Sequence, residues 1–353
     1  MPRPPQIDWP RVAAALAAAI PRERLHPAVN ARTAEAGEAS GRGWGVAFSG
    51  GGDSLALLLL VWAHWPERRD KLTAMHFDHR LRGRESAADA TFCRKVCDAL
   101  GVRYVEGAWA EARKGASEAE AREARFRFFE RELGRRRMRT LWFGHQQDDI
   151  AETLLMRLAR GSGTAGLGAP RPVQAMPGGR VHLRPLLTMK KDALLDALRK
   201  AGAVWREDAS NGTADYFRNR IRREVMPAWV LAATDRDALA GAALSRELLD
   251  EDDAALEAWV DALAPLSADG SRLDVKILHG KPRAVVRRAL HRWLGAQADT
   301  GDLSRQGFEA LLAAVERGGF TRFSLGRSGF AVIRKGVLQF ERLPAAKRTG
   351  RAN

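Results

Sequence analysis

Short apolar runs alternate with longer helical patterns between residue 44 and about residue 200. The runs that predict strands are 44–48, 72–77, 102–107, 140–144 and 181–185. The segments that predict helices are 53–65, 84–100, 117–134, 148–160 and 189–201. Strands and helices that alternate in this way predict an α/β fold with a doubly wound, mostly parallel sheet. Such a sheet binds its ligands beyond the carboxyl ends of the strands.

The pattern changes after Pro227 and predicts a second, smaller α+β domain. Helical periodicity covers 229–263, 282–295 and 303–317, and β-like runs follow between Phe320 and Phe340. We therefore expect an N-terminal extension at 1–43, a first domain at 44–227, a second domain at 228–344 and a basic tail at 345–353.

Charge and cysteine content narrow the class of protein. Lys and Arg number 58 against 43 Asp and Glu, for a formal net charge of +15. This excess indicates a polyanionic partner, with nucleic acid favoured over a membrane surface. A merely basic surface is the alternative. No apolar stretch reaches the roughly 20 residues of a membrane span. Cys93 and Cys97, four residues apart, fit neither a zinc site nor a redox pair, so we expect a cytoplasmic protein.

A glycine-rich segment follows the first predicted strand and precedes a predicted helix. Its residues are Ser49, Gly50, Gly51, Gly52, Asp53 and Ser54. Glycines let a phosphate approach the backbone amides closely, and the positive end of the helix favours an anion there. Asp53 adds a carboxylate where a Mg²⁺-bound polyphosphate would be held. The alternative is an ordinary turn in which Asp53 or Ser54 caps the helix.

Ionisable groups also follow other predicted strands. His76 and Asp78 stand where the second strand ends, beside the glycine-rich segment, although such a pair is also common in loops. His145, Asp149 and Glu152 fall on one side of a helix that begins near residue 145. Two carboxylates three residues apart repel each other unless a cation lies between them, so they predict a site for an amine. Attraction of acids to a helix N-terminus is the alternative explanation.

Several arginines extend toward or beyond this region. Arg122 and Arg125 share one ridge of the predicted helix that Ser117 and Glu120 cap. The segment Phe217 to Arg222 interleaves arginines with an aromatic ring, as RNA contacts do. In the second domain Arg283, Arg287, Arg288 and Arg292 form i, i+4 pairs on one predicted helix. These arginines either contact phosphates or form a solvated helix face, and the sequence leaves both interpretations open.

Together and in this order, these segments resemble the tRNA(Ile)-lysidine synthetase family of PP-loop ATP pyrophosphatases. The resemblance covers about residues 44 to 227 and, more loosely, the second domain. The residues that carry it are the Ser49–Ser54 loop, Asp78-His79, Leu81-Arg82, Glu120, Arg122, Arg125, His145, Asp148-Asp149, Glu152-Thr153, Arg160–Gly163, Trp205, Glu207-Asp208, Ser210-Asn211, Arg218-Asn219 and Ile221-Arg222. The chain departs from the family pattern at Gln146-Gln147, Ile150 and Ala209.

The resemblance implies a PP-loop ATPase-type fold and a two-step reaction that uses ATP and Mg²⁺. ATP adenylates the C2 oxygen of the wobble cytidine in tRNA(Ile) with a CAU anticodon, and pyrophosphate is released. The ε-amine of L-lysine then displaces AMP to form lysidine. The first domain is then the ATP-binding catalytic domain, and the second domain binds tRNA.

The resemblance also implies roles for single residues. The implied catalytic residues are Asp53, His145, Asp149 and Glu152. ATP is expected at Ser49, Gly50, Gly51, Gly52, Asp53, Ser54, His76 and Asp78, with Asp53 as the candidate Mg²⁺ ligand. Lysine is expected at Arg125, Asp149 and Glu152. Arg82, Arg122, Arg218, Arg222, Arg287 and Arg292 are expected to contact tRNA.

Other functions stay open at this stage. Another PP-loop tRNA-modifying enzyme, such as a tRNA thiolase, would usually need further reactive cysteines. An amidotransferase-type synthetase would need a glutaminase domain. A non-catalytic module that binds ATP and RNA is the alternative from a different class. The sequence leaves the oligomeric state open, a homodimer included.

Overall fold

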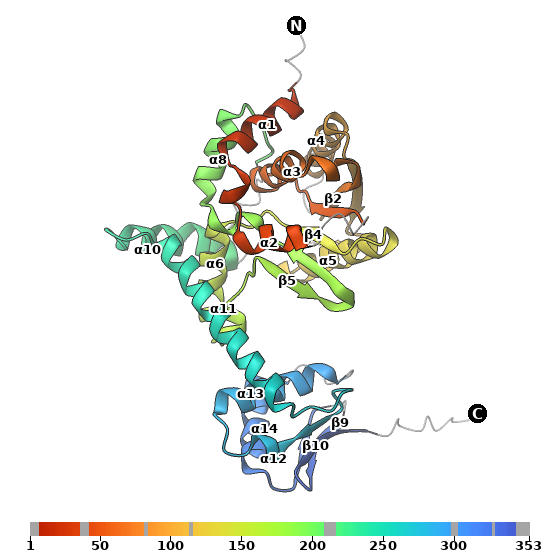
Figure 1. The fold of residues 1–353 in the computed structure, drawn as a ribbon, viewed down its shortest axis with the longest axis vertical. Coiled ribbons are helices and arrows are strands. Elements are labelled where there is room, and N and C mark those ends of the chain that lie inside the picture. Colours follow the sequence, from red (N-terminus) through yellow and green to blue (C-terminus); the bar gives the residue numbers. More distant parts are fainter. Residues whose placement is uncertain are drawn as a thin grey trace, which may run out of the picture. The chain divides into compact units, whose positions relative to one another are not determined.

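The computed structural model describes residues 7–35, 42–80, 84–112, 116–207, 217–297, 303–326 and 329–343 (Figure 1). Arg82, Asp208, Ala209, Ser210, Asn211 and the tail at 345–353 lie outside these ranges. The chain divides into two compact units, Met1–Asp250 and Glu251–Asn353.

The first unit is built on a six-stranded sheet with the strand order β3-β2-β1-β4-β6-β5. Its strands are β1 (Trp44–Ala47), β2 (Leu72–Asp78), β3 (Arg103–Ala108), β4 (Thr140–Trp142), β5 (Val173–Met176) and β6 (Arg180–Leu183). All neighbouring pairs are parallel except β5 and β6. The expected mostly parallel sheet is therefore confirmed, with the five expected strands in place. Strand β5 was missed because it is a short, half-exposed edge strand without a continuous apolar run.

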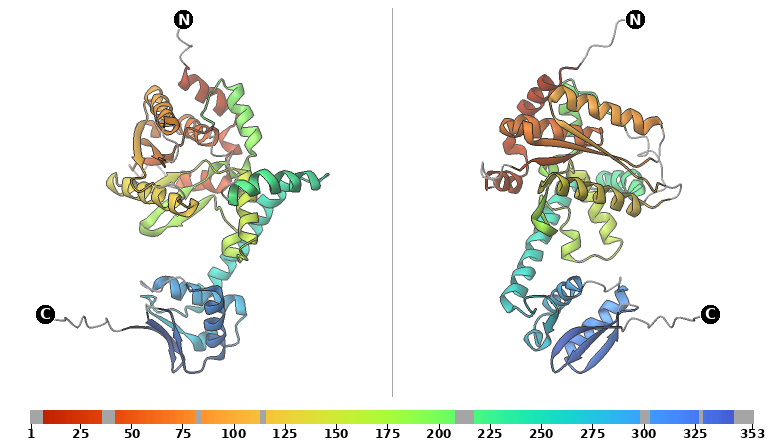
Figure 2. Two further views of the ribbon diagram at one scale, coloured as in Figure 1. Left: turned by 180° about the vertical axis from the view of Figure 1, so that it is seen from behind. Right: turned by 90° about the vertical axis from the view of Figure 1, so that its right-hand side faces the viewer.

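Helices cover both faces of this sheet. They are α1 (Trp9–Ala19), α2 (Pro27–Glu35), α3 (Gly52–His64), α4 (Arg84–Leu100), α5 (Glu118–Arg135), α6 (Gln147–Leu158), α7 (Thr164–Leu167) and α8 (Lys191–Lys200). Figure 2 (right) shows α4 in orange on one face and α5 in yellow on the other. Helices α1 and α8 pack on α3, and α5 packs on β2. The doubly wound arrangement expected from the alternation of elements is thus present.

Helix α3 lies at the centre of the larger hydrophobic core. Every residue from Leu55 to Val61 is buried, because α1 and α8 cover the side of α3 that faces away from β1. Trp9 and Leu16 of α1 belong to the same cluster as Val46 of β1. The described part of the N-terminal extension is therefore an integral layer of the first unit.

The last helices of the first unit pack on α6. They are α9 (Phe217–Arg220), the π-helical turn Ile221–Val225, α10 (Met226–Ala232) and the first part of α11 (Ala238–Leu263). Met226 and Ala242 bury their side chains with Ala151 of α6. This packing keeps residues up to 250 within the first unit, so the change of pattern after Pro227 precedes the division between the units.

The second unit is an α+β fold, as expected. Its antiparallel sheet has the order β7-β10-β9-β8, formed by β7 (Arg272–Asp274), β10 (Val337–Arg342), β9 (Gly329–Arg334) and β8 (Thr321–Ser324). Its helices are the end of α11, α12 (Val275–Leu278), α13 (Arg283–Ala296) and α14 (Arg305–Arg317). Trp293 of α13 and Leu312 of α14 share one core with Ile333 and Leu338 of the sheet. Among the described helices of both units, none combines the length and apolar content that a membrane crossing requires.

The buried run of α3 should dominate the stability of the first unit. Leu58→Ala removes a fully buried side chain and is expected to lower the free energy of unfolding by about 2–5 kcal/mol. Leu158→Ala, at a side chain that is 53% exposed, should change it by about 0.5 kcal/mol or less. Denaturant titrations of both variants check this. Equal losses from the two substitutions would contradict the assignment of α3 as the core helix.

Candidate functional site

The Ser49–Ser54 loop joins the end of β1 to the start of α3, at the carboxyl edge of the sheet. Ser54 Oγ donates to the carbonyl oxygen of Gly51 at 3.0 Å, and the backbone amide of Ser49 donates to Ser54 Oγ at 3.2 Å. No side chain caps α3, whose N-cap residue is Gly51. The first amides of the helix therefore stay available to an anion, as the phosphate interpretation requires.

Two glycines of the loop are required by the geometry. Gly50 has φ of +90°, a conformation that residues with a side chain rarely adopt. A Cβ atom on Gly52 would lie 2.3 Å from Leu195 Cδ2 of α8. Positive φ and close packing thus explain the glycines independently of any ligand, and they hold the loop in a single shape.

His76 lies beneath the loop. Its side chain is buried, and Nδ1 donates to the carbonyl oxygen of Phe48 at 3.0 Å, just before the loop begins. Cys93 Sγ lies 3.6 Å from the same nitrogen. His76 thus supports the loop from below. Asp78, at the end of β2, accepts a hydrogen bond from the amide of Arg80 at 2.7 Å.

Asp53 lies in the first turn of α3 and has an unusual environment. Burial raises the pKa of its carboxyl group to about 6, against the effect of Lys191, whose Nζ lies 4.0 Å from Asp53 Oδ2. The Asp149 carboxylate nearby raises this pKa further. Oδ1 of Asp53 is buried and accepts no hydrogen bond. A hard divalent cation would satisfy this oxygen, so the residue fits a Mg²⁺ ligand. Within the described ranges, no cluster of three His, Cys, Asp or Glu forms a ready-made metal site.

Asp149 and Glu152 project from the first turns of α6 and are almost fully buried, at 8% and 2% exposure. Asp149 Oδ2 accepts from the backbone amide of Gln146 at 3.0 Å, which closes a capping box. The helix-terminus explanation therefore holds for one of its oxygens. It does not hold for Glu152, whose partners come from another part of the chain.

Those partners are two arginines that follow Phe217. Arg218 donates to Asp149 Oδ1 at 2.6 Å and to Glu152 Oε2 at 2.8 Å. Arg222 donates from Nε to Glu152 Oε1 at 2.5 Å and from Nη2 to Oε2 at 3.0 Å. Burial alone would lower the pKa of Arg218, but the carboxylates of Asp149 and Glu152 outweigh it and raise that pKa. The four side chains form one buried ion cluster.

From the sequence we expect Arg218 and Arg222 to contact tRNA. In the structure they contact Asp149 and Glu152, the carboxylates of the predicted amine site. Sequence spacing could not show this, because the pairs span 66 to 70 positions. The sequence feature that indicated a positively charged partner was the pair of neighbouring carboxylates, which repel each other unless a cation lies between them. In the structure two guanidinium groups supply that positive charge.

A second group of cations lies beside this cluster and consists of Arg122, Arg125 and Arg184. Among the described residues, no acid forms an ion pair with any of the three. Burial, together with the charges of Arg122 and Arg218, lowers the pKa of Arg125 to about 10. Burial and Arg122 likewise lower the pKa of Arg184 to about 10. Nε of Arg125 is buried without a hydrogen-bond partner. Mutually repelling arginines with an unused donor favour the binding of an anion.

His145 lies beside this second group. Arg184 Nε donates to His145 Nδ1 at 3.2 Å, so the ring carries its proton on Nε2. Burial, together with Arg184 and Arg218, holds the pKa of His145 well below its ordinary value. The imidazole is therefore neutral and can donate from Nε2. Arg184, which the sequence analysis missed, fixes this tautomer; no sequence motif singled it out.

In the second unit, the two arginines that we expect to contact tRNA, Arg287 and Arg292, form ion pairs with acidic side chains. Arg287 donates to Glu309 Oε1 at 3.3 Å. Arg292 donates to Glu257 Oε2 and to Asp261 Oδ1, both at 2.5 Å. The basic face of α13 is thus partly neutralised by acids of α11 and α14, which the sequence pattern of α13 alone did not show.

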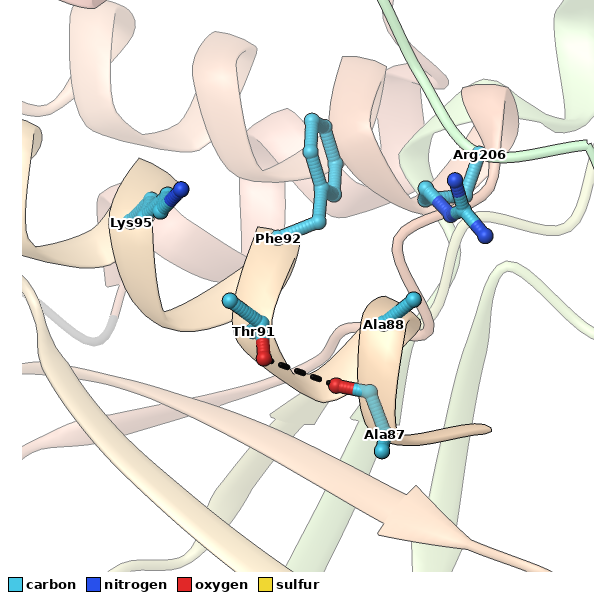
Figure 3. A pocket seen from close by; sticks show the side chains of 6 residues that line it. All are labelled: Ala87, Ala88, Thr91, Phe92, Lys95 and Arg206. Carbon is cyan, nitrogen blue, oxygen red and sulfur yellow. Dashed lines mark hydrogen bonds between the residues drawn. The ribbon is translucent and has the colours of Figure 1, made fainter. Parts of the chain in front are cut away.

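A hollow of about 390 Å³ lies behind the loop (Figure 3). Ala87, Ala88, Thr91, Phe92 and Lys95 of α4 line it, together with Arg206. A Cβ atom on Gly50 would lie 3.4 Å from Phe92 Cδ1 and 3.7 Å from Arg206 Cγ, so the loop borders this hollow. None of the predicted site residues lines this hollow.

Comparison with known proteins bears on this site. The family model described as the PP-loop domain matches residues 25–229. A tRNA(Ile)-lysidine synthase from Geobacter sulfurreducens is 36% identical over 275 residues, which are 75% of this chain and 56% of the relative. The synthase of that name from Symbiobacterium thermophilum is 35% identical over 299 residues, 79% of this chain and 60% of the relative. The chain thus spans little more than half the length of these curated relatives.

A solved structure supports the fold. The U34-tRNA thiolase NcsA from Methanococcus maripaludis superposes with a TM-score of 0.50 at 18% identity, over 68% of this chain and 78% of that one. At this identity the likeness concerns the fold alone. The glycine loop at the end of β1, the mostly parallel sheet and the match over residues 25–229 lead to one conclusion: this chain belongs to the PP-loop family.

Proposed function

We propose that the chain ligates L-lysine to C2 of the wobble cytidine in tRNA(Ile) with a CAU anticodon, using ATP and Mg²⁺ and releasing AMP and pyrophosphate. The observation that carries the proposal is a pair of buried carboxylates, Asp149 and Glu152, of which Asp149 lies close enough to Asp53 of the loop to raise its pKa. The names of the relatives at 35–36% identity support the same reaction. A cytoplasmic location agrees with a tRNA substrate.

The loop serves the activation step. The open amides at the start of α3 would bind the polyphosphate of ATP, and Asp53 would hold a Mg²⁺ ion, which would neutralise phosphate charge. The C2 oxygen of cytidine is a poor leaving group until AMP is attached to it. Adenylation converts it into a good leaving group, so the base becomes open to attack by an amine.

The ion cluster serves the transfer step. An ionised carboxylate offers about four acceptor positions. Asp149 accepts from Gln146 and Arg218, so it retains acceptor capacity for an ammonium group. Asp149 and Glu152 would orient the ε-amine of lysine, and one of them would accept the proton that the amine must lose before attack.

The surrounding cations suit the anionic parts of the substrates. Arg125, with its unused buried Nε, would face the α-carboxylate of lysine or a phosphate. His145 would donate from Nε2 to an oxygen of the substrate. Arg122, exposed on α5, and the basic side chains of α13 would contact tRNA phosphates.

The cysteines argue against a thiolase. Cys93 and Cys97 are buried, and burial raises the pKa of Cys97 to about 12 and that of Cys93 still further. Thiols held protonated beneath the loop are poor nucleophiles and poor cluster ligands. The lysine ligation reaction needs no thiol.

Pyrophosphate exchange tests the activation step alone. Radiolabelled pyrophosphate should enter ATP when tRNA(Ile) with a CAU anticodon is present, without lysine, because adenylation of the base is reversible. A tRNA with a different anticodon is the control. A well-folded protein that shows no exchange with the CAU tRNA would be a non-catalytic module, and the proposal would be wrong.

Asp149→Asn should separate the two steps. The amide preserves shape and the acceptor for Gln146 but removes the charge, so we expect lysine transfer to fall by about 100-fold or more. Pyrophosphate exchange should persist. Glu123→Gln, at an exposed acid on α5, should leave both steps unchanged. Full lysine transfer by Asp149→Asn would remove Asp149 from the mechanism.

Neutralising α13 tests the tRNA interface. Arg287→Gln combined with Arg292→Gln should weaken tRNA binding and lower the slope of log K against log salt by about one for each phosphate that the protein no longer neutralises. Arg94→Gln, at an arginine of α4 that pairs with Glu106, is the control. An unchanged salt slope in the double variant would show that these arginines only join helices through Glu257, Asp261 and Glu309.

A further inference from the structure

Lys191, the first residue of α8, brings an ammonium group to the phosphate loop from a distant part of the chain. The Ser49–Ser54 loop has no lysine, whereas the lysine of a Walker loop reaches the β- and γ-phosphates. Nζ of Lys191 lies 4.0 Å from Asp53 Oδ2. Both side chains are partly exposed, at 31% and 30%, so a ligand at the start of α3 can reach the pair.

Lys191 is held at this position by its backbone and by its own helix. Its amide donates to Asp148 Oδ2 at 2.9 Å, and the amide of Gln147 donates to the carbonyl oxygen of Met189 at 2.8 Å. These bonds fix the start of α8 to the first turn of α6. Leu195, one turn further along the same ridge, packs so closely on Gly52 that a Cβ there would clash with it. These contacts therefore hold the ammonium group of Lys191 beside the loop.

The contact between Lys191 and Asp53 is a partial one. At 4.0 Å it is at the outer limit of an ion pair, and no hydrogen bond joins the two groups. Asp53 Oδ1, which accepts no hydrogen bond, suits a divalent cation instead. A cation on Asp53 would repel Lys191 and direct its ammonium toward negative charge at the start of α3.

We propose that Lys191 binds the β- and γ-phosphates of the nucleotide, the part that leaves as pyrophosphate, and neutralises Asp53 when no nucleotide is bound. This inference rests on the proposed use of ATP but not on lysine or tRNA as substrates. Lys191 thus takes the part of the missing loop lysine, on a long flexible side chain that can exchange a carboxylate for a phosphate.

Calorimetric titration tests the assignment with two matched variants. Lys191→Met removes the charge and keeps much of the aliphatic stem. Lys190→Met removes the neighbouring charge, whose Nζ pairs with Asp237 at 2.5 Å. Each protein is titrated with Mg·ATP, Mg·pyrophosphate and AMP, without tRNA or lysine.

We expect Lys191→Met to weaken the binding of Mg·ATP and of Mg·pyrophosphate by roughly tenfold or more, because one charge-assisted hydrogen bond is lost. AMP should bind within about twofold of the parent value, and Lys190→Met should change none of the three. Lys191→Arg should retain most of the pyrophosphate affinity, since it keeps the charge.

Two results would overturn the inference. If Lys191→Met binds pyrophosphate with unchanged affinity, Lys191 does not contact the phosphates and its role is limited to the contact with Asp53. An equal loss for AMP, or a loss in Lys191→Arg as large as in Lys191→Met, would show that Lys191 merely shapes the loop. Failure of lysine transfer would not affect this readout, so the two proposals can fail separately.

Discussion

The carboxylate of Glu152 is the constraint on which the site depends, because a charge that is 2% exposed must be paired. Arg218 and Arg222 supply the pairing, and they stand on the turns that lead from the sheet-based fold into α10 and α11. Removing one partner from such a cluster leaves an uncompensated buried charge, which costs about 3–5 kcal/mol. The same ion cluster therefore joins α6 to the turns that precede α10.

The distribution of charge around this cluster separates the two halves of the proposed reaction. Open amides, Asp53 and Lys191 adjoin the start of α3 and suit a polyphosphate with its metal. Asp149 keeps acceptor capacity that an amine could use, and among the described residues no acid forms an ion pair with Arg125 or Arg184. Because Asp149 also raises the pKa of Asp53, the two halves are close enough to influence each other. A site that joins an activated base to an amine needs this proximity.

Much of the fold could be predicted from the sequence, since short runs with the period and length of strands mark β1 to β4 and β6, and helical patterns separate them. The glycine loop and the capping box of Ser117 and Glu120 are local patterns, and the structure contains both. Strand β5 was missed because an edge strand needs no apolar run. The candidate site was only half visible, because Asp149 and Glu152 are near each other in the chain but their arginines are not. Arg184 and Lys191 were missed for the same reason, as only the folded sheet brings β6 and α8 to the loop.

We propose that this site joins lysine to a base that ATP has activated. The most direct measurement is ATP-dependent transfer of labelled lysine to tRNA with a CAU anticodon, followed by mass spectrometry of the released nucleosides. We expect label in a modified cytidine that bears lysine at C2, and none when ATP is omitted. Well-folded protein that leaves the cognate tRNA unlabelled in the presence of ATP and lysine would contradict it.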